Sequence, residues 1–396
     1  MRAIKRFLSI GNGALAVAAA MTVFVAAVLA WNAANPIDYL IYTVEGTSYA
    51  KGVVEKVESS TVAWDGSVDR NLGTQKLVVL ITSGDHAGEE VEVTNDLSAT
   101  HNIEASEGMA VVVKIDDPQE SVQPFYSIFN YDRAVPIAAI LGLFAVIMVA
   151  VGGKKGLKSL VGLAFSLFTI MEFLLPAIYH GGSPILMGCL TALVITVLNM
   201  VLLNGISRKT FAAMTSTMAG VLVAVVLYLV FSGAMKLSGY NLDEAEELLA
   251  IHTGTGLDVG QIMFVGVVIS ALGAVMDMCM SVASSLFEMA RLHEGIDGRQ
   301  IVRSGMTIGR DMIGTMCMTL ILAFAGTAIA ALLVMVAYGA QLDTLLASDF
   351  VATELLQSFI GGMAVVLSVP ITALVSSCAI CGLPQGREEE PSAAGR

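Results

Sequence analysis

The chain has 396 residues, of which 56% are hydrophobic and 14% are charged, and its formal net charge is −13. This composition excludes an ordinary soluble domain. Most of the charge is local, because segment 32–133 contains 17 Asp and Glu residues against 6 Lys and Arg. An acidic surface repels phosphate, so we expect no nucleic-acid partner.

Eight apolar stretches are each long enough to cross a membrane as a helix, since a hydrocarbon core about 30 Å thick needs roughly 20 apolar residues. The first, at 13–31, follows Arg2, Lys5 and Arg6. A cleaved signal peptide has the same plan, but we expect an uncleaved anchor. The other seven stretches are expected at 134–151, 157–179, 183–203, 210–234, 259–286, 308–338 and 351–378.

The charges of the loops orient these spans. Lys and Arg cluster before the first span and after the second, fourth and sixth, whereas the opposite loops at 180–182, 235–258 and 339–350 contain only one Lys or Arg residue, Lys236. The positive-inside rule then places both termini in the cytoplasm and the acidic segment outside. We therefore predict an α-helical polytopic membrane protein with four parts: an N-terminal anchor (1–31), an extracytoplasmic β-rich domain (32–133), a seven-helix transmembrane domain (134–381) and a disordered cytoplasmic tail (382–396).

The extracytoplasmic segment changes to a period of two residues, which is typical of strands. Several short strands in about 75 residues favour a small closed barrel. His86 and His101 lack the spacing of metal ligands, so we expect no metal site there. Strands are predicted at 53–57, 75–81, 90–94 and 109–115, with a hairpin loop at 83–88.

Ionisable side chains inside a span are costly and are therefore candidates for function. Glu172, in the third span, either pairs with a neighbouring helix near the outer interface or takes part in transport. The sixth span has a polar stripe, because its polar and small residues are separated by three or four positions and fall on one helix face. The stripe consists of Ser270, Gly273, Asp277, Ser281, Ser284 and Glu288.

The seventh span has a matching pattern. Gly305 and Gly309 have the spacing that allows close helix approach, and Arg310 is a candidate charge partner for Asp277, Glu288 or Asp311. The two spans predict a structural network, a polar pathway lined by Asp277, Asp311 and Glu172, or both. The polar residues of the seventh span recur in steps of four: Thr307, Asp311, Thr315 and Thr319.

Other chemistries find little support. Met and Cys residues crowd both spans and could bind copper(I), but methionine is a common gap filler. Cys378 and Cys381 form a single pair, which favours palmitoylation or packing over zinc. No nucleotide-binding loop, nucleophile elbow or zinc-protease motif occurs, and the motifs that flank membrane aspartyl proteases are missing. We expect no enzyme activity, no cofactor and no metal.

Two adjacent stretches carry a family resemblance. GAVMDMCMSVASSLFE (273–288) and SGMTIGRDMIGTM (304–316) resemble the paired signature of the YibE/F-like family of bacterial multi-pass membrane proteins. The chain departs from the family pattern at Cys317-Met318-Thr319-Leu320, where an Asn is expected before Thr-Leu. The resemblance implies a permease-like layout in a bacterial plasma membrane and includes the Asp277 and Arg310/Asp311 motifs, but it supplies no substrate.

We therefore predict a membrane permease or secondary transporter, coupled to ions or protons, for a small solute or ion of unknown identity. Asp277 would be the coupling carboxylate and Arg310 its charge partner, while Glu172 and Asp311 would line the path. The alternative is a non-transporting scaffold or sensor whose β-rich domain binds a cell-envelope or membrane protein partner.

Overall fold

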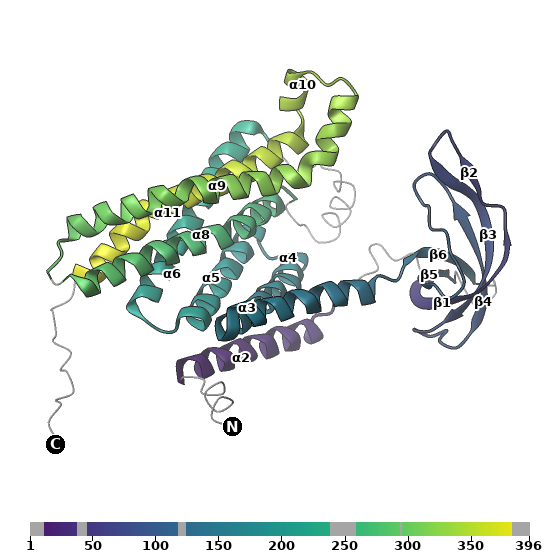
Figure 1. The fold of residues 1–396 in the computed structure, drawn as a ribbon, viewed down its shortest axis with the longest axis horizontal. Helices are drawn as coiled ribbons and strands as arrows, with labels where there is room; N and C mark the ends of the chain where they lie inside the picture. Colours follow the sequence, from purple (N-terminus) through teal and green to yellow (C-terminus); the bar gives the residue numbers. More distant parts are fainter. Residues whose placement is uncertain (1–11, 38–45, 118–123, 238–258, 294, 382–396) are drawn as a thin grey trace. The chain divides into compact units, whose positions relative to one another are not determined.

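The computed structural model describes residues 12–37, 46–117, 124–237, 259–293 and 295–381. The chain divides into two compact units (Figure 1). One unit is helical and comprises 1–37 and 151–396, and the other, 38–150, contains the β-strands. The tail expected to be disordered, 382–396, lies outside the described residues.

Long apolar helices dominate the chain, as expected, and seven among the described residues are long and apolar enough to cross a membrane. The spans expected at 134–151 and 157–179 lie in one helical stretch of 46 residues. It is interrupted at Gly153, whose φ of 54° suits a residue without a Cβ. The helices are α2 (Asn12–Ala34), α3 (Ala134–Phe168), the π-helix η2 (Thr169–Leu174), α4 (Leu175–Tyr179), α5 (Pro184–Asn204), α6 (Arg208–Met235), α8 (Val259–Leu292), α9 (Gly298–Ala337), α10 (Leu342–Leu346) and α11 (Asp349–Cys381).

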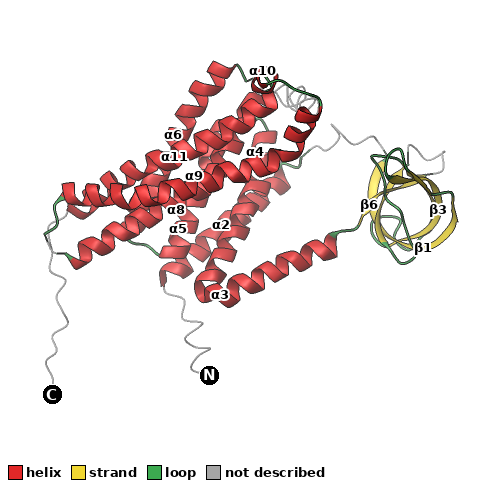
Figure 2. Ribbon diagram, turned by 45° about the horizontal axis from the view of Figure 1, so that its top comes forward, coloured by secondary structure: helices red, strands yellow, loops and turns green. Residues whose placement is uncertain are grey.

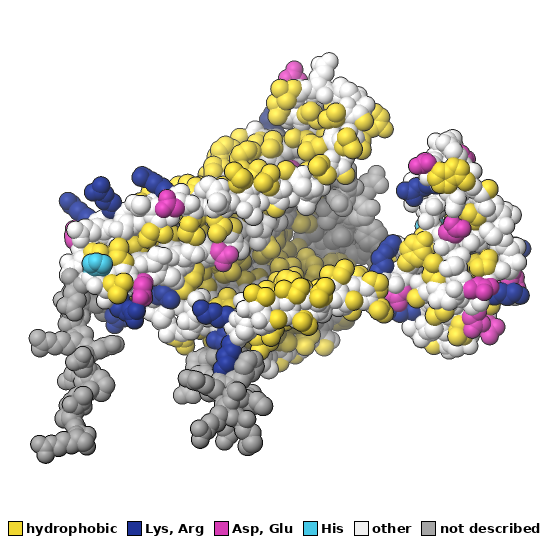
Figure 3. Space-filling view, in the orientation of Figure 1, with side chains coloured by type: hydrophobic (Ala, Val, Ile, Leu, Met, Phe, Trp, Pro, Cys, Tyr) yellow, Lys and Arg dark blue, Asp and Glu magenta, His cyan; other side chains and the backbone are white. Residues whose placement is uncertain are grey.

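The core of the helical unit is formed mainly by α6, α8 and α11, and α5 packs on α6 and α8. Phe264, Met278 and Leu286 of α8 are fully buried there. α9 lies alongside α11 in both ribbon views (Figures 1 and 2). Figure 3 shows apolar side chains over much of the outer surface of the helices, and such a surface is suited to contact with a bilayer.

Two glycines allow α9 and α11 to approach each other closely. A Cβ on Gly305 would lie 2.8 Å from Cβ of Ala373, and one on Gly309 would lie 2.9 Å from Cγ2 of Val369. Both glycines are buried. The predicted glycine spacing therefore serves the contact with α11, and Gly305 also touches Leu286 of α8.

We expect Gly309→Ala to destabilise the helical unit, because the added methyl group overlaps Val369. Overpacking of this kind costs about 1–3 kcal/mol. Gly326→Ala is the matched control, since no atom lies within 4 Å of its Cβ position and alanine favours a helix. Thermal unfolding of the purified protein in detergent should show a lower midpoint for Gly309→Ala alone, and equal midpoints would contradict the close contact.

The β-strands form one antiparallel sheet in the order β2-β3-β1-β5-β6, with β4 paired to β3. The four predicted strands and the hairpin between β3 and β4 are confirmed, whereas β2 and β6 were not predicted. The strands are β1 (Thr47–Ser60), β2 (Ala63–Asp65), β3 (Arg70–Ile81), β4 (Glu90–Leu97), β5 (Ala110–Asp116) and β6 (Phe125–Tyr131).

The sheet curls around its own apolar core, as Figure 2 shows. Alternate residues point inward, and Val54, Val79, Val111 and Val113 are each 0% exposed. The prediction of a closed barrel needs correction. β4 and β6 contact each other, but no strand pairing joins them among the described residues, so the sheet is a partial barrel.

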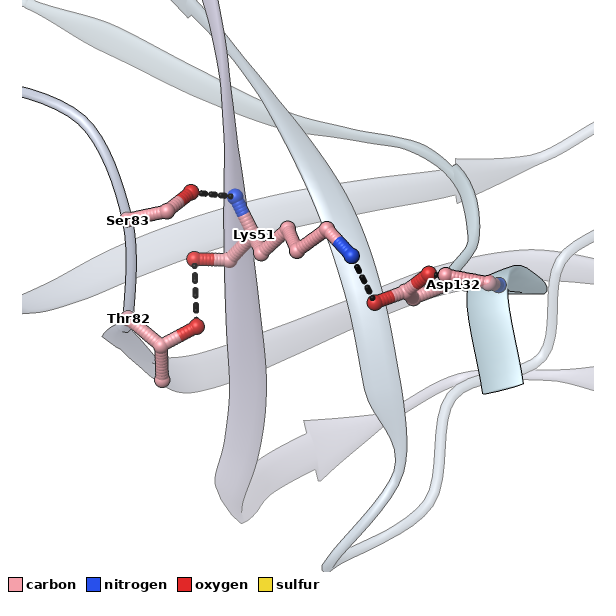
Figure 4. Close-up of polar contacts among 5 residues, drawn as sticks. Lys51, Thr82, Ser83 and Asp132 are labelled. Carbon is pink, nitrogen blue, oxygen red and sulfur yellow. Dashed lines mark hydrogen bonds and ion pairs between the residues drawn. The ribbon is translucent and has the colours of Figure 1, made fainter. Parts of the chain in front are cut away.

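Polar contacts hold β1 to the start of α3 (Figure 4). The Lys51 ammonium lies 3.0 Å from Oδ2 of Asp132, and the backbone N–H of Ala134 donates to Oδ1 of Asp132 at 2.9 Å. On the other side of β1, the Lys51 backbone N–H donates to Oγ of Ser83 and its carbonyl accepts from the Thr82 hydroxyl. Asp132 therefore accepts from the first backbone N–H of α3 and is also an ion-pair partner of β1.

These contacts make the stability of the β unit depend on pH. The donated Ala134 N–H and the Lys51 ammonium hold the pKa of Asp132 below its usual range. Ionised Asp132 therefore stabilises the fold above about pH 3.9, the ordinary value for Asp, and this contribution is lost as the pH falls through the lower folded-state pKa.

We expect Asp132→Asn to lower the urea midpoint of the β unit at pH 7 and to have a shrinking effect as the pH approaches 3. Trp64 fluorescence in a Trp31→Phe background reports on this unit. Asp85→Asn, in the exposed β3–β4 turn, is the control and should show no such convergence. A constant difference between wild type and Asp132→Asn would contradict the role of the charge.

Candidate functional site

The contacts of two glycines give the relative depth of residues on α8 and α9. Gly305 meets Leu286, while Gly361 of α11 meets both Leu320 and Ala271. Going from Ala271 to Leu286 along α8 therefore corresponds to going from Leu320 to Gly305 along α9. The two helices therefore run antiparallel. A residue a given number of positions after Ala271 on α8 lies at the same depth as the residue that many positions before Leu320 on α9.

Asp277 lies near mid-depth in the helical unit. Gly220, close to the middle of α6, would place a Cβ 2.8 Å from Val275 and 3.4 Å from Ser368. Asp277 follows Val275 by two residues, or about 3 Å along the helix axis. Because half of a hydrocarbon core is about 15 Å thick, Asp277 is at a depth where ionised groups are costly.

The polar stripe of α8 lies on one face, as its spacing predicted. Gly273, Asp277 and Glu288 are exposed and Ser281 and Ser284 are half-buried. The opposite face of α8 is buried in the core, with Val275, Met278, Cys279, Val282 and Leu286 at 0–1% exposure. Among the described residues no atom lies within 4 Å of the Cβ position of Gly273, so this part of the structure leaves open space one turn from Asp277.

The polar residues of α9 are also exposed, and they include Arg310, Asp311, Gly314 and Thr315. The Thr315 hydroxyl donates to the backbone carbonyl of Met312 at 3.0 Å, so it is satisfied within its own helix. By depth, Arg310 is level with Ser281 of α8, and Gly314 is level with Asp277. The two stripes therefore occupy the same layer.

The structure does not pair the charges as the sequence suggested. Among the described residues, no ion pair within 4.0 Å joins Arg310 to Asp277, Glu288 or Asp311. Glu288 instead pairs with Arg291 of its own helix at 2.7 Å, and both side chains are mostly exposed. A pair of this kind contributes little to stability.

Glu172 belongs to a different part of the helical unit. It lies in η2, which packs against α2, α4 and α5. The Asn32 amide of α2 donates to its carboxylate at 3.0 Å and to its backbone carbonyl at 2.9 Å. Nearby, His180 Nε2 lies 3.1 Å from the Asn35 carbonyl and its ring contacts Trp31. Glu172 thus pairs with a neighbouring helix, one of the two roles considered for it.

Sequence reasoning missed two polar side chains in the spans. Glu354 of α11 is half-buried, and its Oε2 atom is buried without a hydrogen-bond partner in the described structure. Asn199 of α5 donates to Ser166 at 2.7 Å and lies against Gly162, linking α5 to the second half of α3. Both were visible as an acid and an amide inside apolar stretches.

The cysteines of α8 and α9 lie in different surroundings. Cys279 is fully buried in the core of the helical unit. Cys317 contacts the Gly362 carbonyl of α11 at 3.6 Å. No group of three His, Cys, Asp or Glu residues that could hold a metal ion occurs among the described residues.

The chemistry that remains is that of a single carboxylate at mid-depth. Asp277 can take up a proton or a cation, and neutralisation lowers the cost of holding it in an apolar layer. Ser281 and Ser284, one and two turns further along the same face, offer hydroxyl oxygens in sequence. The arrangement is suited to binding and passing a small cation or proton.

Comparison with family models matches the part of the chain that contains these residues. A family model described as YibE/F-like protein matches residues 140–382. Comparison with curated proteins and with solved structures found no match. The matched segment covers more than half of the chain and contains both polar stripes, so the chain belongs to the YibE/F-like protein family.

Proposed function

We propose that this protein is a membrane permease, a secondary transporter in which Asp277 binds the coupling proton or cation. The observation that carries the proposal is the Asp277 carboxylate at mid-depth, which forms no ion pair with any of the described residues. It lies on a helix face that has open space at Gly273 and hydroxyls at Ser281 and Ser284. Ionisable residues within a span commonly mark ion pathways.

The proposed membrane arrangement has eight crossings, with α3 crossing once before Gly153 and the stretch from Gly153 to Tyr179 crossing back. Together these 46 residues would measure about 69 Å, which is roughly twice the hydrocarbon thickness. Both termini lie in the cytoplasm of a bacterial cell and the β unit lies outside. Figure 3 supports this orientation, because the basic side chains of the helical unit gather mainly at one end.

The proposed mechanism follows from the cost of charge. An ionised Asp277 attracts a cation into a layer that hydrocarbon otherwise closes to it, and binding neutralises both charges. Release requires water to reach the carboxylate from the other side. Pro370 interrupts the hydrogen bonding of α11 beside the core, which provides a point where that helix can bend.

A scaffold or sensor is the second candidate, favoured by the surface of the β unit. Tyr49 and Phe129 are exposed and in edge-to-face contact with ring centroids 4.9 Å apart. Phe125, also exposed, lies on the same strand as Phe129. An exposed aromatic group of this kind fits an interaction with another protein. In that case the helices would hold a complex together without moving a solute.

Asp277→Asn should abolish gradient-driven flux in proteoliposomes, because the amide cannot bind a proton or neutralise a cation. Proton movement would be followed with a pH-sensitive dye while panels of ions and small metabolites are offered. Asp343→Asn, an exposed acid in α10, is the control and should retain wild-type flux. Flux that survives in Asp277→Asn would remove this residue from the mechanism.

The scaffold proposal predicts the opposite result for Asp277→Asn. A scaffold should tolerate Asp277→Asn and lose its partner when the β unit is deleted. Absence of flux from correctly folded wild-type protein, together with partner capture that needs the β unit, would favour the scaffold.

A water-filled path along α8 should also be visible by thiol labelling. In a background in which the five native cysteines are replaced, Ser281→Cys and Ser284→Cys should react with a membrane-impermeant maleimide in intact membranes. Ala283→Cys, at a fully buried position, is the control and should stay unlabelled. Equal protection of all three positions would contradict an aqueous path.

A further inference from the structure

The geometry points to a second copy of this chain as the partner of the exposed face of α9, with Arg310 of each copy paired to Asp311 of the other. Both side chains are exposed. They are level with Ser281 and Met280 of α8, and so lie only about 8–9 Å from the mid-depth layer marked by Val275. Hydrocarbon cannot solvate them at that depth, so this face requires a polar partner.

The described chain does not supply that partner. Arg310 and Asp311 are adjacent in sequence and point about 100° apart around the helix, so they do not face each other. The first half of α3, 134–150, belongs to the other unit and contains only apolar residues. It could cover an apolar surface but could not neutralise either charge.

A second copy fits because Arg310 and Asp311 lie on opposite sides of a line drawn along the exposed face of α9, parallel to the helix axis. Thr307 marks the line, Arg310 lies about 60° to one side of it and Asp311 about 40° to the other. Two copies inserted in the same direction are related by a two-fold axis along the membrane normal, so their α9 helices run parallel at equal depth. The two-fold rotation places the Arg310 side of one copy against the Asp311 side of the other, twice.

The residues on the line allow the two helices to come close. Thr307, Gly314 and Ala325 are small and exposed, and Met318, which is also exposed on this line, has a flexible side chain between Gly314 and Ala325. In the part of the chain that the structure describes, no atom lies within 4 Å of the Cβ position of Gly314. Small residues let helix backbones approach in lipid, which brings the flanking charges within reach of each other. Opposite charge and small side chains thus mark the same face independently.

This pairing does not depend on transport, because a scaffold could form the same dimer. The first test is cross-linking in native membranes. With the five native cysteines replaced, Thr307→Cys should form a disulfide between copies under mild oxidation, seen as a band of twice the mass on a non-reducing gel. Leu222→Cys, on the exposed surface of α6, is the control and should stay monomeric.

The second test exchanges the charges in the Thr307→Cys background. Arg310→Glu alone, or Asp311→Arg alone, leaves like charges opposed, and either should reduce the cross-link to the level of the Leu222→Cys control. Co-expression of the two variants with different tags should restore it between the tags, because each then carries the charge that the other lacks. Restoration would also show that both variants fold.

The outcomes decide the proposal. Failure of Thr307→Cys to cross-link with native charges would overturn it. A cross-link that persists in the single charge variants, or one that co-expression does not restore, would equally rule out the Arg310–Asp311 pairing.

Discussion

The inability of hydrocarbon to solvate polar groups is the constraint on which the rest of this structure depends. Helices satisfy their own backbones, and several of the buried hydroxyls are satisfied within their own helix in the same way. Thr217, Ser368 and Thr372 each donate to a carbonyl three or four residues earlier in the same helix. Such residues allow close packing and carry no charge. Asp277, Arg310 and Asp311 cannot be satisfied in that way, and this is why function is to be sought at these three residues.

The extent of the helices and most of the strands could be predicted from the sequence, because length, apolar content and period are local properties. Which helices and strands lie side by side could not be predicted in the same way. Which helix lies beside Asp277 depends on packing among residues far apart in the chain, as the Asn32–Glu172 contact across 140 residues illustrates. Barrel closure is a similar case, since it depends on whether the edges of β4 and β6 pair, and the alternation within each strand does not decide this.

The candidate site shows the same division. The spacing of polar residues on α8 correctly gave one face, because the geometry of a helix fixes which positions share a face. It did not give the neighbour of that face, and Arg310 proved to lie on an exposed surface of α9. Glu354 and Asn199 were accessible to sequence reasoning but formed no regular stripe. A search that weighs each polar residue by its depth in an apolar stretch, and not by its periodicity, would have found both.

The common depth of the two stripes would link the proposed ion binding to the proposed assembly. Asp277 is level with Gly314, a residue on α9 that leaves room for a second helix. A partner helix at Gly314 would change how much of this layer is exposed to lipid and how much to protein or water. Because the free energy of a carboxylate depends strongly on those surroundings, the second copy would set the conditions under which Asp277 takes up an ion. A monomeric bundle would leave Arg310 and Asp311 facing lipid in the same layer, and the cost of that exposure favours the paired state.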